Sequence, residues 1–303
     1  MFVIAAPGQG SQKPGFLAPW LESPSYRADL EGWSEIIGSD LIAHGTTSDQ
    51  ETITDTAIAQ PLIVASGIIV GRALLEALPE STNAAFAGHS VGEFTAAALA
   101  GVLSDDDALS LVALRGRAMA EASAATPTGM SAVIGGDPEV LGDAVDAAGL
   151  FAANFNGGGQ VVIAGELTHL AQFQENPPEG MRVIPLTVAG AFHTPYMQSA
   201  VSTLAEAASG VATHEAHRPL YTNRDGSRVA PSNALGYLVD QVARPVRWDL
   251  CMESFSKDGI QGMMELAPGA LVGLAKRALK GVPTVALNSP DDLAAAVELV
   301  SGA

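Results

Sequence analysis

No segment limits the folding options of this chain more than Gly88-His89-Ser90-Val91-Gly92. An apolar run, Ala84–Ala87, precedes it and an Ala-rich run, Val91–Ala100, follows it, so the pattern predicts a tight turn between a strand and a helix. Flanking glycines let the backbone bend and let neighbouring elements approach closely. In such a turn Ser90 carries an exposed hydroxyl at a helix N-terminus, which stabilises negative charge. With 32 glycines in the chain, the pentapeptide is only moderately specific, and an ordinary strand-to-helix turn is the alternative.

Apolar strands and longer helices alternate along most of the chain. Strands are predicted at Phe2–Ala6, Ala84–Ala87, Gly262–Glu265 and Thr284–Leu287. Helices are predicted at Ala57–Leu78, Val91–Ala100, Asp105–Ala122 with Ser104 as its N-cap, Pro195–Ala208, Ala234–Val242, Asp249–Lys257, Leu271–Leu279 and Asp291–Val300. This alternation is typical of an α/β fold in which helices cover both faces of a mostly parallel sheet.

The elements become shorter in the middle of the chain, after Thr126-Pro127-Thr128-Gly129. Strands are predicted there at Met130–Ile134, Phe151–Phe155, Gln160–Ala164 and Arg182–Leu186, with helices at Asp137–Ala148 and Leu167–Gln174. This β-α-β-β-α-β order is the ferredoxin-like plan. We therefore expect residues 126–190 to form an inserted ferredoxin-like subdomain, and residues 1–125 and 191–303 to form the core.

The composition excludes several classes of function. A net charge of −18, with no Lys/Arg-rich segment, disfavours binding to nucleic acid or to an anionic membrane surface. The apolar stretch Ala57–Leu78 contains Arg72 and Glu76, so a buried core helix fits it better than a membrane span. Cys251 is the single cysteine, which excludes an intrachain disulfide and favours a small buried hydrophobe over a nucleophile. The N-terminal run has no basic leader, no metal-ligand spacing occurs, and the expected compartment is cytoplasmic.

A serine is a weak nucleophile without a base, and six histidines are available. His193 lies in a loop just before a predicted helix, and we select it as general base and then general acid. His89 adjoins the serine, and the turn is expected to point its ring elsewhere. The other histidines are expected at the surface or in a loop: His44, His169, His214 and His217.

Two further features have a chemical interpretation. Arg115 falls in the interior of an apolar helical pattern, where an arginine can grip a carboxylate with two hydrogen bonds. Pairing with an internal Asp or Glu, or snorkelling to water, is the alternative, and Arg117 is the competing arginine. The Gly-rich turn Pro7–Gln12 can aim backbone N–H groups into a site or be purely structural, and it lacks the Gly-Lys-Ser/Thr ending of a phosphate loop.

Six segments of the sequence resemble one known family when they are taken together. In chain order they are Pro7-Gly8-Gln9-Gly10-Ser11-Gln12, Gly88-His89-Ser90-Val91-Gly92-Glu93, Arg115-Gly116-Arg117-Ala118-Met119, Asn154-Phe155-Asn156 with Gly159–Gly165, Ala191-Phe192-His193 and Pro245-Val246-Arg247-Trp248. This series is similar to the malonyl-CoA:acyl carrier protein transacylases and to the acyltransferase domains of polyketide synthases. The resemblance spans essentially the whole chain, and it implies an α/β-hydrolase-like core with a ferredoxin-like insertion.

The resemblance also implies a reaction. Malonyl-CoA would donate its malonyl group to the phosphopantetheine thiol of acyl carrier protein through a malonyl-serine intermediate, with no cofactor. Ser90 would be the nucleophile and His193 the base. The backbone N–H groups of Gln9 and Val91 would form the oxyanion hole, and Arg115 would bind the malonyl carboxylate.

The resemblance implies further substrate contacts. Asn156 is expected on the coenzyme A side, and His89 among the substrate-binding residues. Phe192 is expected to add bulk where an α-methyl branch would project. Arg247 is expected to orient the histidine through its backbone carbonyl, although many relatives carry Gln there. Arg244 also departs from the family pattern, in which Asn is usual, and the sequence offers no physical reason for that change.

The partner and the competing functions are less constrained by the sequence. Lys276, Arg277 and Lys280, on one predicted helix, are expected to attract the acidic carrier protein, and a solvated helix face is the alternative. A monomer is expected. A thioesterase or esterase using the same elbow, and a non-catalytic binding module, are the competing functions. The sequence leaves open whether the acceptor serves fatty acid or polyketide synthesis.

Overall fold

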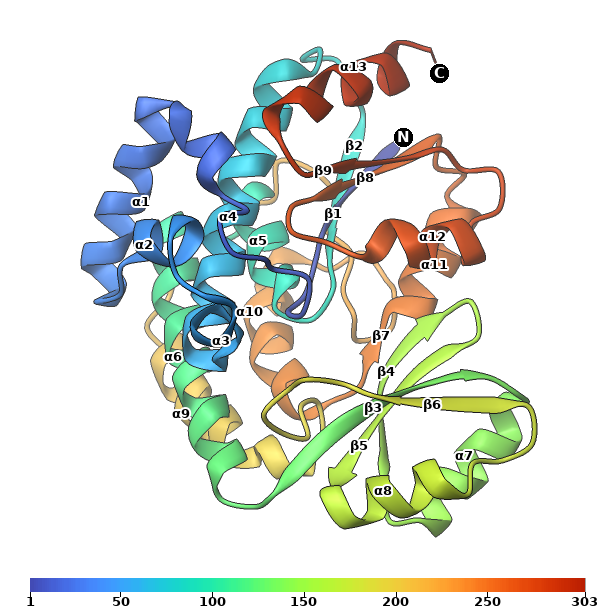
Figure 1. Ribbon diagram of the computed structural model, residues 1–303. Helices are drawn as coiled ribbons and strands as arrows, with labels where there is room; N and C mark the ends of the chain where they lie inside the picture. Colours follow the sequence, from blue (N-terminus) through green and yellow to red (C-terminus); the bar gives the residue numbers. More distant parts are fainter. Residues whose placement is uncertain (303) are drawn as a thin grey trace.

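The computed structural model describes residues 1–302, in which a larger α/β body lies beside a smaller β-sheet subdomain (Figure 1). The larger body contains a four-stranded sheet in the order β2-β1-β8-β9. Its neighbouring strands all run parallel, and they are β1 (Phe2–Ala6), β2 (Ala84–Gly88), β8 (Gly262–Leu266) and β9 (Thr284–Leu287). The first, second and third of these are buried along their whole length, as expected for strands covered on both faces. The predicted parallel core is confirmed.

Helices surround this sheet on both sides (Figure 1). Before the small subdomain come α1 (Pro24–Ile37), α2 (Leu41–Thr46), α3 (Gln50–Thr54), α4 (Thr56–Ala77), α5 (Gly92–Leu99) and α6 (Asp105–Ala124). After it come α9 (Gln198–Ala208), α10 (Pro231–Asp240), α11 (Trp248–Lys257), α12 (Leu271–Ala278) and α13 (Leu293–Ser301). Short 3-10 turns occupy Ala18–Glu22, Pro195–Met197, Gln241–Ala243 and Pro290–Asp292.

Two of the sequence-based expectations about helices are wrong. The sequence patterns assigned His44 to a loop, but it lies in α2, where its Nδ1 is 3.1 Å from Ser48 Oγ. The α12 helix ends at Ala278, so Lys280 follows the helix and does not share it with Lys276. Both errors concern short or terminal stretches of helix, where the apolar period is too brief to define the end.

The α4 helix forms the apolar centre of the larger body. Asp55 begins it, because its carboxylate accepts a hydrogen bond from Ala57 N at 2.8 Å. By length and composition α4 could cross a membrane, but 83% of its apolar 18-residue window is buried inside the molecule, as in a core helix. At Gly67 a Cβ would lie only 2.7 Å from the Thr95 side chain, so this glycine lets α5 pack directly against α4. The long helix thereby supports the helix that follows Ser90.

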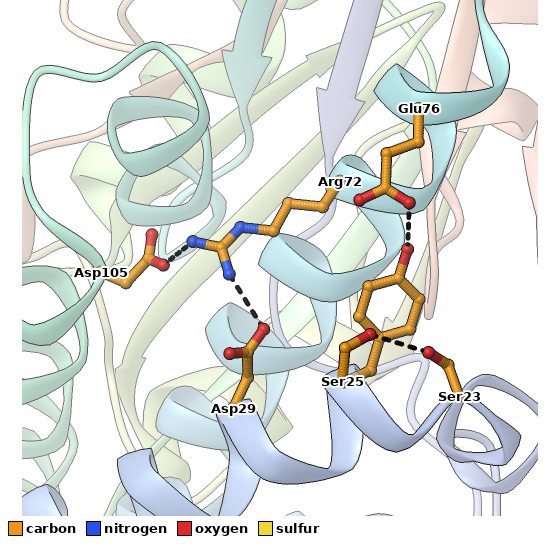
Figure 2. Close-up of polar contacts among 7 residues, drawn as sticks. Ser23, Ser25, Asp29, Arg72, Glu76 and Asp105 are labelled. Atoms are coloured by element: carbon orange, nitrogen blue, oxygen red, sulfur yellow. Dashed lines mark hydrogen bonds and ion pairs between the residues drawn. The ribbon is translucent and has the colours of Figure 1, made fainter.

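A cluster of polar contacts fastens α1 to α4 and α6 (Figure 2). Arg72 on α4 pairs with Asp29 of α1 at 3.0 Å and with Asp105 at the start of α6. On the next turn of α4, Glu76 accepts a hydrogen bond from Tyr26 at 2.9 Å, and burial together with this carboxylate raises the pKa of Tyr26 to about 12. Arg72 is thus paired with carboxylates on two helices, and this pairing stabilises its charge within an otherwise apolar helix.

The smaller subdomain has the ferredoxin-like order predicted from the sequence. Its elements are β3 (Thr128–Gly135), α7 (Pro138–Ala147), β4 (Phe151–Gly157), β5 (Gln160–Glu166), α8 (Leu167–Glu175) and β6 (Met181–Pro185). They form an antiparallel sheet in the order β6-β3-β5-β4. A fifth strand, β7 (Val246–Arg247), comes from the larger body and pairs parallel with β4. This two-residue strand was not predicted, because its sequence carries no strand period of its own.

The two faces of the small sheet have different partners. A cluster that includes Val133, Ile163 and Phe173 packs one face against α7 and α8. Residues of the opposite face, among them Met130 and Val162, belong to the main core cluster. The small sheet therefore forms one wall of the space between the two bodies, and that space contains the candidate site.

Candidate active site

Ser90 lies on a sharp turn between β2 and α5. Its φ of 53° is in the left-handed region, which non-glycine residues rarely adopt. The flanking glycines are required by close backbone contacts: a Cβ at Gly88 would lie 2.1 Å from the Gly92 carbonyl carbon, and a Cβ at Gly92 would lie 2.3 Å from Ala6 O. The turn is thus pressed between its own helix and β1, which holds Ser90 at the edge of the parallel sheet.

The serine hydroxyl contacts the histidine that the sequence singled out. Ser90 Oγ lies 2.7 Å from His193 Nε2, and His193 Nδ1 lies 2.8 Å from the backbone carbonyl of Gln241. Because a carbonyl only accepts, Nδ1 carries the proton and Nε2 is left to accept one from the serine. Burial, and then the charge of Arg115, lowers the pKa of His193 to about 3, so the ring is neutral. Among residues 1–302, His193 is the one other non-glycine residue with a positive φ, at 62°.

The expected orienting residue of the histidine is corrected by this geometry. The carbonyl that contacts His193 belongs to Gln241 and not to Arg247. Arg247 instead makes two hydrogen bonds to Asp249, at 2.9 and 2.7 Å, and its guanidinium stacks 4.7 Å from the centre of the Phe155 ring. With Arg244 it lines a second cavity of about 350 Å³ behind β4, so neither arginine faces the serine.

Two backbone N–H groups are available beside the serine. Gln9 and Val91 both line the same cavity as Ser90, and neither backbone N–H donates to a protein acceptor within residues 1–302. The N–H of Ser90 itself is occupied, since it donates to Asn223 Oδ1 at 2.7 Å. Val91 precedes the first residue of α5, so its N–H points out of a helix N-terminus. Of the two predicted oxyanion donors, Val91 directly follows Ser90 and Gln9 lines the same cavity, and neither N–H has an acceptor within residues 1–302.

A cavity of about 660 Å³ lies between the two bodies, with the dyad on its wall. The predicted residues that line it are Gln9, His89, Ser90, Val91, Arg115, Asn156, Phe192, His193 and Arg277. His89 faces the cavity and does not point away, because its Nε2 is held 2.8 Å from Asn156 Oδ1 and its ring packs edge-on against Trp248. The structure therefore brings residues from both bodies together around one space.

Arg115 is buried, at 1% exposure, and it lines this cavity, whereas Arg117 is exposed on the same helix. Its Nη1 donates to Gln60 Oε1 at 2.6 Å and its Nη2 to Gln241 Oε1 at 3.2 Å. Nε has no hydrogen-bond partner, and the contacts are neutral amides, not the internal carboxylate that was the alternative. Arg115 therefore places a positive charge on the cavity wall, together with an N–H donor that no protein acceptor uses, and both favour binding of a carboxylate.

The sequence did not identify the residues that hold this arrangement together. Glu93, Asn223, Gln60 and Gln241 are all buried, and each contacts a predicted site residue or one of its supports. Glu93 was visible as the sixth residue of the motif that begins at Gly88. Gln60 and Gln241 lie in predicted helices and Asn223 lies outside every predicted element, and in none of the three does a single sequence show that the polar side chain is buried at the site.

The remaining predicted features lie outside the catalytic contacts. Lys276 and Lys280 are exposed and have no carboxylate partner within residues 1–302, and Arg277 reaches the cavity. Cys251 is fully buried and its thiol donates to Thr222 O at 3.2 Å, in agreement with a structural residue. Among residues 1–302 no group of three or more His, Cys, Asp or Glu side chains is placed to hold a metal ion.

The fold, with a serine on a strand-to-helix turn beside a histidine, is that of the acyltransferases. In agreement with this, the sequence model of the acyl transferase domain family matches residues 1–287. The chain is 47% identical over 283 residues to the malonyl CoA-acyl carrier protein transacylase of Mycolicibacterium smegmatis, covering 91% of this chain and 98% of that protein. It is 33% identical over 307 residues to the Escherichia coli O157:H7 protein of the same name, covering 98% and 99%.

Solved structures agree with the sequence relatives. The crystal structure of MCAT from Mycobacterium tuberculosis superposes with a TM-score of 0.95 at 45% identity, over 98% of this chain and 99% of that one. A malonyl-transacylase in complex with a type II PKS acyl-carrier protein superposes with a TM-score of 0.90 at 31% identity, over 98% and 99%. The chain therefore belongs to the malonyl CoA-acyl carrier protein transacylase family.

Proposed function

We propose that this protein transfers the malonyl group of malonyl-CoA to the phosphopantetheine thiol of acyl carrier protein, with Ser90 as the covalent carrier. The observation that carries the proposal is the shared cavity: Ser90 Oγ lies 2.7 Å from a neutral His193, and the same cavity is lined by Arg115, whose Nε has no protein acceptor. The nucleophile, its base and an anchor for the malonyl carboxylate are thus combined in one site. The function agrees with the family to which the chain belongs.

The first half-reaction begins with attack of Ser90 Oγ on the thioester carbonyl of malonyl-CoA. His193 Nε2 accepts the serine proton, and its Nδ1–H remains fixed on the Gln241 carbonyl, which stabilises the positive ring as it forms. The developing oxyanion is accepted by the N–H groups of Gln9 and Val91. Collapse of the tetrahedral intermediate breaks the carbon–sulfur bond, and His193 returns the proton to the departing coenzyme A thiolate.

The second half-reaction reverses these steps with a new thiol. The phosphopantetheine thiol of the carrier protein gives its proton to His193 and attacks the malonyl-serine ester, and Ser90 leaves with that proton. The acyl group changes from thioester to ester and back, so the protein mainly lowers barriers and excludes water. The exposed, unpaired Lys276 and Lys280 near the cavity wall formed by α12 supply local positive charge for an acidic carrier protein.

Selection of malonyl rests on two side chains of the cavity wall. Arg115 pairs with the free carboxylate, and Phe192, which is 7% exposed, occupies the space that an α-methyl branch would need. A pocket rejects one extra methyl group by only about 1–3 kcal/mol, so some methylmalonyl transfer is expected. Rejection of acetyl is expected to be stronger, because acetyl-CoA leaves the buried donors of Arg115 unpaired.

The partners and setting follow from the same reaction. Malonyl-CoA and acyl carrier protein are the substrates, no cofactor is needed, and the protein acts as a cytoplasmic monomer without binding membrane or nucleic acid. Asn156 and His89, joined to each other at the cavity wall, contact the coenzyme A side.

Intact-mass spectrometry after mixing with malonyl-CoA tests the proposal. A malonyl adduct is expected on the native protein and on Cys251→Ser, which lacks the only thiol, but not on Ser90→Ala. Addition of carrier protein should discharge the adduct onto the carrier. Rapid loss of malonyl-CoA to water without carrier protein would instead identify a thioesterase, and an adduct that persists in Ser90→Ala would reject the proposed nucleophile.

A further inference from the structure

Glu93 is a buried carboxylate with no direct role in the proposed reaction. It lies on the first turn of α5, three residues after Ser90, and is 5% exposed. Its Oε1 accepts a hydrogen bond from Asn223 N at 2.8 Å, and its Oε2 accepts one from Gln241 Nε2 at 2.5 Å. Burying a carboxylate is costly, so a role that requires the charge is expected at such a position.

The two partners of Glu93 each hold one half of the catalytic dyad. Asn223 accepts from Ser90 N at 2.7 Å through Oδ1 and donates to Gly88 O at 2.6 Å through Nδ2, so it fixes the serine turn from behind. Gln241 accepts the Nδ1 proton of His193 on its backbone carbonyl. Asn223 and Gln241 lie far from Glu93 in the sequence, at separations of 130 and 148 residues.

The chemistry of these contacts requires an acceptor at both carboxylate oxygens. Asn223 N and Gln241 Nε2 are both donors, and an ionised carboxylate accepts at each oxygen. A protonated Glu93, or a glutamine in its place, would turn one N–H or O–H toward one of these donors. One of the two segments would then lose its hydrogen bond to α5. The side-chain oxygen of Gln241 is already committed to Arg115, so a flip of its amide would place N–H groups against the guanidinium.

We propose that the ionised carboxylate of Glu93 is a positioning group that fixes the position of Ser90 relative to His193. It does so by accepting hydrogen bonds from both Asn223 and Gln241. The charge of Arg115 on α6 offsets part of the cost of burying this anion without touching it, since Gln241 lies between them. Arg115 therefore keeps its free donors for substrate. The inference rests on the proposed function only in taking Ser90 and His193 as the reacting pair.

The acidity of Glu93 makes the proposal testable by pH. Burial raises the pKa of Glu93 to about 7, against the lowering effect of the Asn223 N–H, Thr222 and Arg115. The ionised, positioning form is therefore present above about pH 7 and is lost as the pH falls through that value. The charged and titratable groups around Glu93 are Arg115, Asp225, Cys251, Tyr221, Tyr237 and, beyond Gln241, His193. His193 itself does not titrate near pH 7, because its pKa is about 3.

The experiment measures how fast Ser90 is sulfonylated by phenylmethanesulfonyl fluoride, a neutral reagent with no carboxylate for Arg115. For the native protein the rate constant is expected to fall as the pH drops through about 7. Above pH 7, Glu93→Gln should react about 10- to 100-fold more slowly than the native protein, as for a displaced catalytic group. Its rate constant should also lack the fall near pH 7, which we call the pH limb. An unchanged rate, or the same limb in Glu93→Gln, would overturn the proposal.

A swap variant separates positioning from a general effect on folding. In Glu93→Gln/Gln241→Glu the carboxylate and the amide exchange places. The amide oxygen at position 93 then accepts from Asn223 N, as the native carboxylate does, and the amide N–H at position 93 donates to the new carboxylate at position 241. The backbone carbonyl of position 241 still accepts from His193. Sulfonylation should recover to within about threefold of native. Malonyl loading should stay low, because the new carboxylate pairs directly with Arg115. Failure of sulfonylation to recover, in a swap variant whose circular dichroism and melting are native-like, would reject the positioning role.

Asp105→Asn is the matched control, since it also replaces a carboxylate by an amide and removes a partner of Arg72 (Figure 2), and Asp105 does not line the cavity. It should lower the melting temperature and leave sulfonylation unchanged. If it slows sulfonylation as much as Glu93→Gln does, loss of stability explains both and the proposal fails. The proposed function fails separately: a native protein that is sulfonylated with the expected pH limb, yet takes no malonyl group from malonyl-CoA, would refute malonyl transfer and leave the role of Glu93 standing.

Discussion

Replacing Arg115 by methionine isolates the contribution of the guanidinium to the choice of substrate. Methionine keeps most of the apolar stem in the core, and the buried Arg115 side chain makes no direct hydrogen bond to a carboxylate, although its charge lowers the pKa of Glu93. What is lost is the positive charge and its N–H donors. Two of the five donors are used by Gln60 and Gln241, which leaves Nε and one N–H on each terminal nitrogen for the malonyl carboxylate.

The size of the effect follows from the bonds that the carboxylate would make. A hydrogen bond to a charged group contributes about 1.5–3 kcal/mol, so two bonds from guanidinium to carboxylate contribute about 3–6 kcal/mol. The value of kcat/KM for malonyl-CoA should therefore fall by about 10²- to 10⁴-fold. Acetyl-CoA makes no such bonds, so its kcat/KM should fall far less than that for malonyl-CoA, by no more than the weaker ionisation of Glu93 costs. Stability should fall only moderately, by about 1–3 kcal/mol for each amide oxygen left without a donor.

The assay is rapid-quench measurement of the acyl-enzyme formed from malonyl-CoA or acetyl-CoA, without carrier protein. Arg117→Met is the matched control, because Arg117 is exposed two residues away on the same helix and should leave both rates unchanged. The ratio of malonyl to acetyl loading is the decisive quantity, since a general disturbance lowers both. A ratio that stays native in Arg115→Met would refute the carboxylate-binding role, even if both rates fall.

Three further predictions concern the base, the turn and the carrier protein. The lowered pKa of His193 means that its ring should show no protonation in NMR spectra between pH 8 and pH 5, and Arg115→Met should raise that pKa; a midpoint near 6.5 would contradict the burial argument. Gly92→Ala should destabilise the fold by about 1–3 kcal/mol or more in denaturant unfolding, because the added Cβ meets Ala6 O at 2.3 Å, while Gly236→Ala, with nothing within 4 Å, should not. Lys276→Glu/Lys280→Glu should raise the KM for carrier protein by about threefold or more at low salt and leave the KM for malonyl-CoA unchanged, with Lys257→Glu as control; equal effects on both substrates would reject local attraction.

The sequence predicted those features whose signal is local. The apolar strands, the glycines around Ser90 and the order of the six ferredoxin-like elements each leave a pattern in the sequence, and the structure contains them. His193 could be selected because it lies in a loop just before a predicted helix, and Arg115 because an arginine inside an apolar helix is unusual. By contrast, α1 and α2 have mixed polar sequences without a clear apolar period, so the sequence did not predict them as helices. Tertiary contacts stabilise these segments in the folded chain, such as the pairing of Asp29 in α1 with Arg72.

The error at Arg247 has a physical cause of the same kind. The group that orients the histidine is a backbone carbonyl, and every residue has one, so no side-chain pattern can identify which carbonyl faces His193. The structure assigns it to Gln241, at the start of a 3-10 turn, where a backbone carbonyl and a side-chain amide of one residue reach the dyad and Arg115 together. Glu93 then explains why such a residue is held in place: one anion on the serine helix fixes both of the distant segments that the reaction needs. The residues of the candidate site were therefore predictable as residue types, but the network that gives them their geometry exists only in the folded chain.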